Sequence, residues 1–258
     1  KCIFCAVPAV SGYKFKIRSP ESVLEEIKEC ITKYGIKVFF FRSDTFTMDK
    51  KWVIKFCELV VREGLKIRWG TNSRVDTIDE ERLEWMKKAG CWIIGFGVES
   101  GNQEMLDKMK KGITIEQADK AVKLCKKYKI KTYLLFVLGL PWETRETAID
   151  TIEFAKKLDG DFVDFNIAYP LPGTEYFEIA KDSALCDLSS LSGFDYANPL
   201  ARSFYLSTEE LIELRKKALK SFYFRPQYVI RTLLNIRSLK VLNSYLYSGL
   251  QLLYKSRN

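Results

Sequence analysis

The sequence of 258 residues contains no histidine. Nucleophilic sites of the Ser-His-Asp or Cys-His kind are therefore excluded, and so are zinc or iron sites ligated by histidine. The sequence also has no run of about 18 uncharged apolar residues, the length that a membrane-spanning helix needs. Any chemistry must come from cysteines, carboxylates or a bound cofactor.

Acidic residues are missing from the C-terminal part of the chain. None follows Glu213, whereas Lys and Arg recur up to Arg257, and the formal net charge is +9. Such a balance favours encounters with anionic partners and says little about the fold. The basic residues alternate with aromatic ones, and they allow two interpretations: peripheral contact with a membrane surface, or helices that pack over the core with their cations solvated. The residues concerned are Tyr223, Arg225, Tyr228, Arg231, Arg237, Lys240, Tyr245 and Tyr247.

The seven cysteines are too sparse and odd in number for a disulfide scaffold. Reduced thiols are typical of the cytoplasm, and we predict that location. Only Cys2 and Cys5 have C-x-x-C spacing, so a zinc ribbon, which needs two such pairs, is not supported. A redox dithiol is disfavoured because residues 6–12 suggest a loop where a helix should open on the pair. The remaining cysteines are expected in the core (Cys30, Cys57, Cys91, Cys125), while the place of Cys186 stays open.

Short apolar runs alternate with amphipathic stretches along most of the chain. The runs predict strands at 38–41, 66–69, 92–96, 132–138 and 162–167. The stretches predict helices at about 20–34, 50–62, 80–89, 103–109, 114–128 and 143–158, with a short helix after Pro172. This order indicates an α/β fold with a parallel sheet covered on both faces, either doubly wound or a barrel.

Composition divides the chain into three parts. Residues 1–183 carry the strand and helix alternation and form the predicted core. Residues 184–207 are rich in Ser, Leu and Gly, which suggests a linker or lid. Residues 208–258 suggest a C-terminal helical region.

Five segments with polar, glycine or proline residues each follow a predicted strand: 42–46, 71–74, 95–101, 138–144 and 169–174. Local roles could explain each one: a helix cap at Ser43, Asp44, Thr45 or Asp49, or an acidic first turn at Glu143. Because the carboxyl ends of parallel strands share one edge, the five segments together predict a single site there.

The segment 95–101 invites comparison with a dinucleotide-binding motif. It does not match, because Ser100 stands where the third glycine should be. Glu99 would also repel a pyrophosphate, and its carboxylate suits a ribose diol or an ammonium group better.

These motifs together resemble the radical S-adenosylmethionine (SAM) superfamily, in particular its cobalamin-binding branch. Cys2-x-Phe4-Cys5 matches the end of the CxxxCxΦC loop of that family. The segments Gly97-Val98-Glu99-Ser100-Gly101, Gly139-Leu140-Pro141-x-Glu143-Thr144 and Pro170-x-Pro172-Gly173-Thr174 match later signatures in the same order. The match runs from Cys2 to about Lys181, and residues 222–226 resemble the C-terminal helical region of the branch more loosely.

The resemblance implies a partial (β/α)6 TIM-like barrel lacking its first strand, with a C-terminal helical region. It implies a [4Fe–4S] cluster held by three thiolates, two of them Cys2 and Cys5, with the first cysteine four residues before Cys2 and outside this chain. Phe4 would lie near the adenine, Ser43 and Asp44 near the methionine amino group although the usual Gly-Gly-Glu is absent, and Glu99 on the ribose. The other implied cofactor-binding residues are Arg74, Ser100, Gly139 and Pro172.

The implied activity is reductive cleavage of SAM to a 5′-deoxyadenosyl radical that abstracts hydrogen from a small-molecule substrate. An apolar or cyclic metabolite is expected, together with a reductase or flavodoxin-type electron donor, and with cobalamin held by a domain upstream of this chain. One alternative is an RNA-modifying methylthiotransferase-like enzyme, which the helical tail argues against, so a nucleic acid partner is not expected. Another is a non-enzymatic metal or nucleic-acid-binding module built on Cys2 and Cys5, which leaves the later motifs unexplained.

Overall fold

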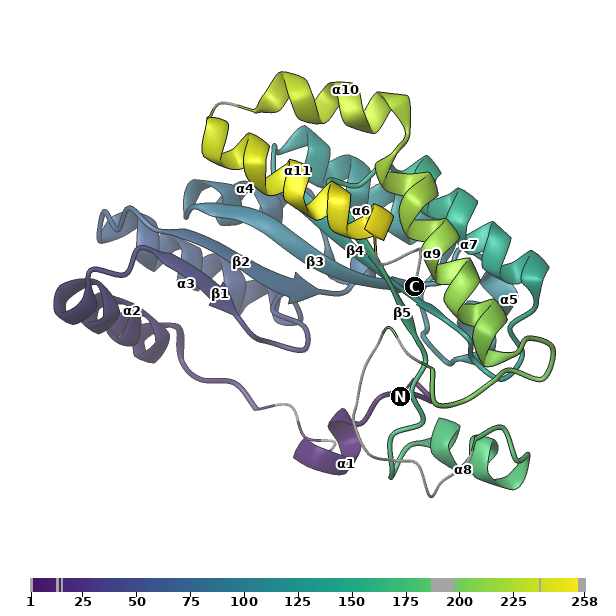
Figure 1. Cartoon of the computed structure of the whole chain (residues 1–258). Helices are drawn as coiled ribbons and strands as arrows, with labels where there is room; N and C mark the ends of the chain where they lie inside the picture. The colour runs from purple at the N-terminus through teal and green to yellow at the C-terminus, as the bar shows by residue number, and fades with distance from the viewer. Residues whose placement is uncertain are drawn as a thin grey trace.

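The computed structural model describes residues 2–12, 14, 16–186, 197, 199–236 and 238–254. Five parallel strands form one sheet in the order β1-β2-β3-β4-β5 (Figure 1). Their bounds are β1 Val38–Phe41, β2 Arg68–Ser73, β3 Cys91–Glu99, β4 Lys131–Leu138 and β5 Phe162–Ile167. A doubly wound sheet reverses its strand order part-way, whereas this order follows the chain throughout. The sheet is therefore an open, partial barrel, as predicted.

The predicted helices are present before, between and after the strands. They are α2 Pro20–Tyr34, α3 Lys50–Arg62, α4 Glu80–Lys88, α5 Gln103–Lys108, α6 Ile115–Lys127, α7 Arg145–Leu158 and α8 Glu175–Asp182. A Ser, Thr, Asp or Asn side chain caps the N-terminus of each by accepting a hydrogen bond from a first-turn amide. Residues 6–12, expected as a loop, include the short helix α1 Val7–Ser11, and η1 Val75–Thr77 follows β2.

The two faces of the sheet differ in burial, which corrects the prediction that both would be covered. Along β4 the side chains of Leu134, Phe136 and Leu138 are buried, whereas those of Tyr133 and Leu135 between them are only half-buried. In Figure 1, α3, α4 and α6 lie behind the sheet, which matches this alternation. The half-covered face is the inner wall of the open barrel.

Several element boundaries differ from the sequence-based prediction by a few residues, and three of these differences concern the site. Strand β2 continues to Ser73, so Arg74 directly follows it. Strand β3 continues to Glu99, which is its last residue. Helix α7 begins at Arg145 with Thr144 as its cap, so Glu143 lies before the helix and not in its first turn.

The C-terminal region forms α9 Thr208–Tyr223, α10 Pro226–Asn235 and α11 Leu239–Tyr254. Helix α9 packs against β5 and α7. Of the predicted linker, residues 187–196 and 198 lie outside the described residues; beyond them, Ala201 bridges to Cys186 and the amide of Phe204 donates to the carbonyl of Pro141 (2.8 Å). None of the helices in the described residues is long and apolar enough to cross a membrane.

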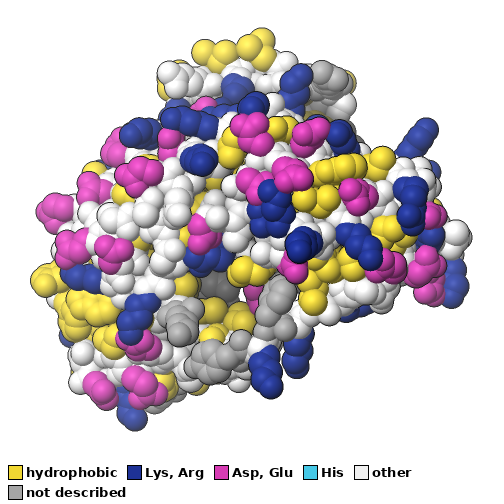
Figure 2. Space-filling view, turned by 180° about the vertical axis from the view of Figure 1, so that it is seen from behind, with side chains coloured by type: hydrophobic (Ala, Val, Ile, Leu, Met, Phe, Trp, Pro, Cys, Tyr) yellow, Lys and Arg dark blue, Asp and Glu magenta, His cyan; other side chains and the backbone are white. Residues whose placement is uncertain are grey.

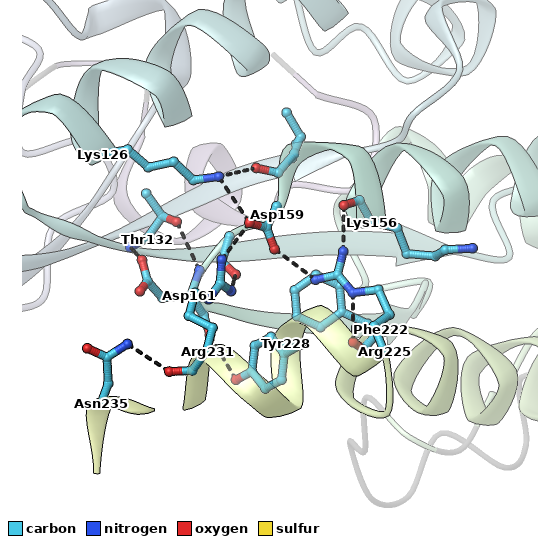
Figure 3. Close-up of polar contacts among 12 residues, drawn as sticks. Lys126, Thr132, Lys156, Asp159, Asp161, Phe222, Arg225, Tyr228, Arg231 and Asn235 are labelled. Carbon is cyan, nitrogen blue, oxygen red and sulfur yellow. Dashed lines mark hydrogen bonds and ion pairs between the residues drawn. The ribbon is translucent and has the colours of Figure 1, made fainter. Parts of the chain in front are cut away.

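A cluster of charges fastens α10 to the core. Asp159, just after α7, forms ion pairs with Arg225, Arg231 and Lys126 (Figure 3). The guanidinium group of Arg225 also donates a hydrogen bond to the carbonyl of Lys156 at 2.5 Å. The interpretation that the cations of this region are solvated is therefore wrong for Arg225 and Arg231. Both guanidinium groups point toward the core because Asp159 is the acidic partner that the tail itself lacks.

Candidate functional site

The loop of Cys2 and Cys5 is held between two distant parts of the chain. The side chain of Ile3 is buried (1% exposed), its amide donates to the carbonyl of Met109 (3.1 Å), and its carbonyl accepts from the amide of Tyr176 (2.9 Å). The amide of Cys5 donates to the carbonyl of Cys2 (3.1 Å), which closes a turn. The buried Ile3 therefore fixes the loop, and both thiols are free and half-buried.

A buried ion pair lies at the end of β3. The ammonium Nζ of Lys111 is 2.6 Å from Oε1 of Glu99, and each side chain is 10% exposed. Glu99 has a left-handed backbone (φ 67°), which turns the chain at the strand end. A Cβ at Gly97 would lie 2.3 Å from Oε1 of Glu99 and 3.0 Å from Nζ of Lys111. Gly97 therefore leaves the space that the pair occupies.

Sequence reasoning missed Lys111, although it found Glu99. The only signal was a lysine twelve residues after the glutamate in a basic stretch, where solvent exposure is the ordinary expectation. The structure brings the two together because helix α5 returns the chain to the carboxyl end of β3.

Arg74 supports the Lys111 segment. Its guanidinium pairs with Asp76 (2.9 Å) and donates to the carbonyls of Lys111 (3.2 Å) and Gly112 (3.4 Å). The hydrogen bond with Asp76 is the main cause that raises the pKa of Arg74. These contacts make Arg74 a support for Lys111, and its direct contact with a cofactor stays a prediction.

The electrostatic surroundings of Cys2 combine burial with nearby charges. Burial is the largest effect and raises the pKa of the Cys2 thiol, the charge of Lys111 lowers this pKa, and that of Glu99 raises it. Cys2 and the Glu99–Lys111 pair therefore lie close enough to interact. A cation beside the thiol favours the thiolate, which is the form that binds metal.

Ser100 and Ser43 have different surroundings. The Ser100 hydroxyl is buried, shares a hydrogen bond with the hydroxyl of Thr151 (3.0 Å) and accepts from the amide of Asn102 (3.1 Å). Ser100 therefore fastens the end of β3 to α7. The side chains of Ser43 (half-buried) and Asp44 (exposed) have no hydrogen-bond partner among the described residues. Asp49 caps α3, so these two side chains stay free for a ligand.

The turn after β4 contains a buried carboxyl group. Glu143 is 1% exposed; its Oε2 accepts from the amide of Gly139 (3.3 Å) and its Oε1 from the hydroxyl of Thr147 (2.5 Å). Burial raises the pKa of Glu143 to about 7. Gly139 has φ 83°, and a Cβ there would lie 2.8 Å from Cδ1 of Leu211, so only glycine fits this turn.

The remaining predicted residues lie on neighbouring loops. Pro172 is exposed in a turn where the amide of Thr174 donates to the carbonyl of Leu171 (3.2 Å). The next residue, Gly173, approaches Ala9 of α1, since a Cβ on it would lie 3.1 Å from the Cβ of Ala9. Phe4 packs against the core beside the two cysteines and is half-buried.

The donor set at the edge of the sheet partly fits an iron–sulfur cluster. Two thiols on one turn with a cation nearby suit thiolate ligation of iron. The described residues contain no group of three or more His, Cys, Asp or Glu side chains placed to hold a metal ion. Cys2 and Cys5 could therefore supply two ligands, and a third must come from elsewhere.

The fold and this edge define an open parallel α/β barrel with a thiol pair and a buried acid–base pair at its strand ends. Residues 1–155 match the family model described as the radical SAM superfamily, and the chain belongs to this family. It is 38% identical over 230 residues to an uncharacterised methyltransferase of Pyrococcus horikoshii, with 89% of this chain and 50% of the relative aligned. It is 29% identical to an anaerobic magnesium-protoporphyrin IX monomethyl ester cyclase of Cereibacter sphaeroides, covering 87% of this chain and 37% of the relative.

A solved structure has the same fold. The radical SAM methyltransferase TsrM of Kitasatospora setae, with cobalamin and a [4Fe–4S] cluster bound, aligns with a TM-score of 0.67 and 21% identity over 84% of this chain and 44% of that chain. This chain spans half or less of the length of these relatives.

Proposed function

We propose that the protein binds a [4Fe–4S] cluster through Cys2, Cys5 and a third thiolate upstream of Lys1, and cleaves SAM reductively. The observation that carries the proposal is the convergence of the Cys2–Cys5 loop and the Glu99–Lys111 pair at the carboxyl edge of the sheet. Bound together, the cluster and SAM would supply one-electron cleavage of the C5′–S bond and a 5′-deoxyadenosyl radical that takes hydrogen from the substrate.

The residues of this chain would bind and orient SAM. Oε1 of Glu99 is held by Lys111, which leaves Oε2 to accept from ribose hydroxyls. Lys111 places a positive charge at this edge of the sheet, where it would attract an anionic group of the cofactor. Ser43 and Asp44 are free to accept from the methionine ammonium group, and Phe4 offers a ring near the adenine.

The test uses the full-length protein, purified without oxygen, reconstituted with iron and sulfide, reduced with dithionite and supplied with SAM. We expect 5′-deoxyadenosine from the wild type and at least about a hundredfold less from the Cys2→Ala, Cys5→Ala double variant, because thiolate ligands hold the cluster. A Cys57→Ala variant, which loses a buried thiol of α3, serves as the control and should keep its cluster. A cluster that forms equally well in the double variant would refute the ligand assignment.

We further propose that the reaction is a methylation or cyclisation of an apolar or cyclic metabolite, with cobalamin bound by a domain upstream. The names of the two relatives, a methyltransferase and a cyclase, support the reaction class, and that of the cyclase supports a cyclic substrate. Absorbance of cobalamin that copurifies with the full-length protein tests the cofactor.

The RNA-modifying alternative expects a small β-barrel after the core, whereas residues 208–236 and 238–254 form helices apart from short connections. A nucleic acid would favour a surface of basic side chains, whereas Figure 2 shows basic and acidic side chains interspersed over the face it presents.

We propose a peripheral contact of α10 with an anionic membrane. Arg231 of this helix points inward to Asp159, whereas Ile230, Leu233 and Leu234 are 58%, 56% and 81% exposed. The outward face is thus apolar, and since no acidic residue follows Glu213, the region carries only positive charge. Apolar side chains with basic residues nearby are the features that attach a helix to an anionic lipid surface.

A vesicle flotation experiment checks this contact. We expect the full-length protein to float with vesicles containing phosphatidylglycerol, and the Leu233→Ser, Leu234→Ser variant to lose about tenfold in affinity because less apolar surface enters the lipid. The Tyr34→Ser variant, which changes an exposed residue of α2, should bind as the wild type does. Equal flotation of all three proteins, or self-association in place of vesicle binding, would refute the proposal.

A further inference from the structure

Glu143 accepts hydrogen bonds from several parts of the chain around the turn after β4. Its two carboxyl oxygens accept from the amide of Gly139 and the hydroxyl of Thr147, and its backbone carbonyl accepts from the hydroxyl of Ser203 (2.8 Å). No cation forms an ion pair with it among the described residues. A buried carboxyl group without a cation is costly, so packing alone does not account for its presence.

One branch of contacts leads from Glu143 to the loop of Pro172. The amide that donates to Glu143 belongs to the peptide unit between Leu138 and Gly139. The carbonyl of this unit accepts from the amide of Ala168 at 2.7 Å. Hydrogen bonds that share one peptide unit strengthen each other. Ala168 begins the segment after β5 that leads to Pro172, so Glu143 helps to hold the start of this segment against β4.

A second branch leads to the cysteines. The carbonyl of Gly139 accepts from the hydroxyl of Tyr176 at 3.4 Å, and the amide of Tyr176 donates to the carbonyl of Ile3 at 2.9 Å. Tyr176 is fully buried, so its ring transmits the position of the Gly139 turn to the loop between Cys2 and Cys5. Residues 3, 139, 143 and 176 are thus linked without passing through the Glu99–Lys111 pair.

We propose that Glu143 is a positioning residue, which holds the Gly139 turn and through it the Cys2–Cys5 and Pro172 loops in the arrangement that binds the cofactor. This inference rests on the proposed function for the identity of the cofactor. It assigns Glu143 no contact with the reacting atoms.

Amide hydrogen exchange of the full-length protein tests the inference independently of activity. The Glu143→Ala variant should lose protection at the amides of Ala168 and Tyr176 by about tenfold, since the charge-assisted bond that fixes the turn is gone. Glu143→Gln should restore most of this protection, because an amide oxygen can still accept from Gly139. The control is Thr132→Val, which removes a buried hydroxyl at the opposite end of β4 and should leave both amides unchanged.

Tyr176→Phe provides a second variant in case Glu143→Ala fails to fold. It removes only the bond to the carbonyl of Gly139 and should speed exchange at residue 176 while leaving that at Ala168 unchanged. In reconstituted protein, Glu143→Ala should raise the SAM concentration needed for half-maximal cleavage about tenfold, and Glu143→Gln should reverse the rise. Protection at Ala168 and Tyr176 that falls no further than in Thr132→Val would overturn the inference. If exchange changes in Glu143→Ala as expected but the wild-type protein does not cleave SAM, the proposed function is refuted and the positioning role stands.

Discussion

The Lys111→Met variant should lose about 3 kcal/mol of unfolding free energy, because it leaves the carboxylate of Glu99 buried without its cation. Both side chains are 10% exposed and their charged atoms are 2.6 Å apart, so solvent screens the pair only weakly. Chemical denaturation of wild type and variant at pH 7 measures the loss. The double variant Lys111→Met, Glu99→Gln should recover most of it, since no unpaired charge remains.

The neighbouring lysine provides the control for this prediction. Lys110 pairs with Glu175 at 2.6 Å, but these side chains are 55% and 48% exposed. Lys110→Met should therefore cost less than about 1 kcal/mol. The double variant at Lys111 and Glu99 separates stability from ligand binding: it should fold as well as the wild type and bind SAM poorly. Equal losses of unfolding free energy in Lys110→Met and Lys111→Met would show that the buried pair stabilises the fold no more than the exposed pair does.

The Glu143→Gln variant should become more stable relative to the wild type as the pH rises. Burial raises the pKa of Glu143 from 4.5 to about 7, so the folded protein holds this proton more tightly than the unfolded chain does. Below pH 4.5 the carboxyl group is neutral in both states and costs nothing. Between pH 4.5 and about 7 the unfolded chain ionises first, and the wild type loses stability until the folded carboxyl group is ionised as well.

The size of the effect follows from the shift in pKa. A shift from 4.5 to about 7 corresponds to about 3 kcal/mol at pH 8, which the glutamine variant should not lose because it does not titrate. Denaturation of both proteins between pH 4 and 8 measures the difference. Glu146→Gln, in the first turn of α7, is the matched control, since the pKa of Glu146 is lowered and its side chain is exposed. A stability difference that stays constant with pH would contradict the buried ionisation of Glu143.

The helices and strands could be predicted from local pattern. Apolar runs such as 132–138 and capping residues such as Asp49 act over a few residues, so their consequences are already present in the sequence. The placement of Glu99 and Gly139 at one edge could also be predicted, because the carboxyl ends of parallel strands meet there. The local pattern could not decide between a doubly wound sheet and a barrel, because strand order is a property of the assembled sheet; only the family resemblance predicted the barrel.

The sequence by itself thus determined which elements form and which of their ends carry the site, since hydrophobic periodicity and capping are local. Only the tertiary structure decided which side chains meet there. Lys111 joins Glu99, Glu143 is buried against Gly139, and Arg231 points inward to Asp159. In each case the free energy of the charged group depends on its desolvation in the folded protein. This desolvation arises only once helices from distant parts of the chain have packed around the group.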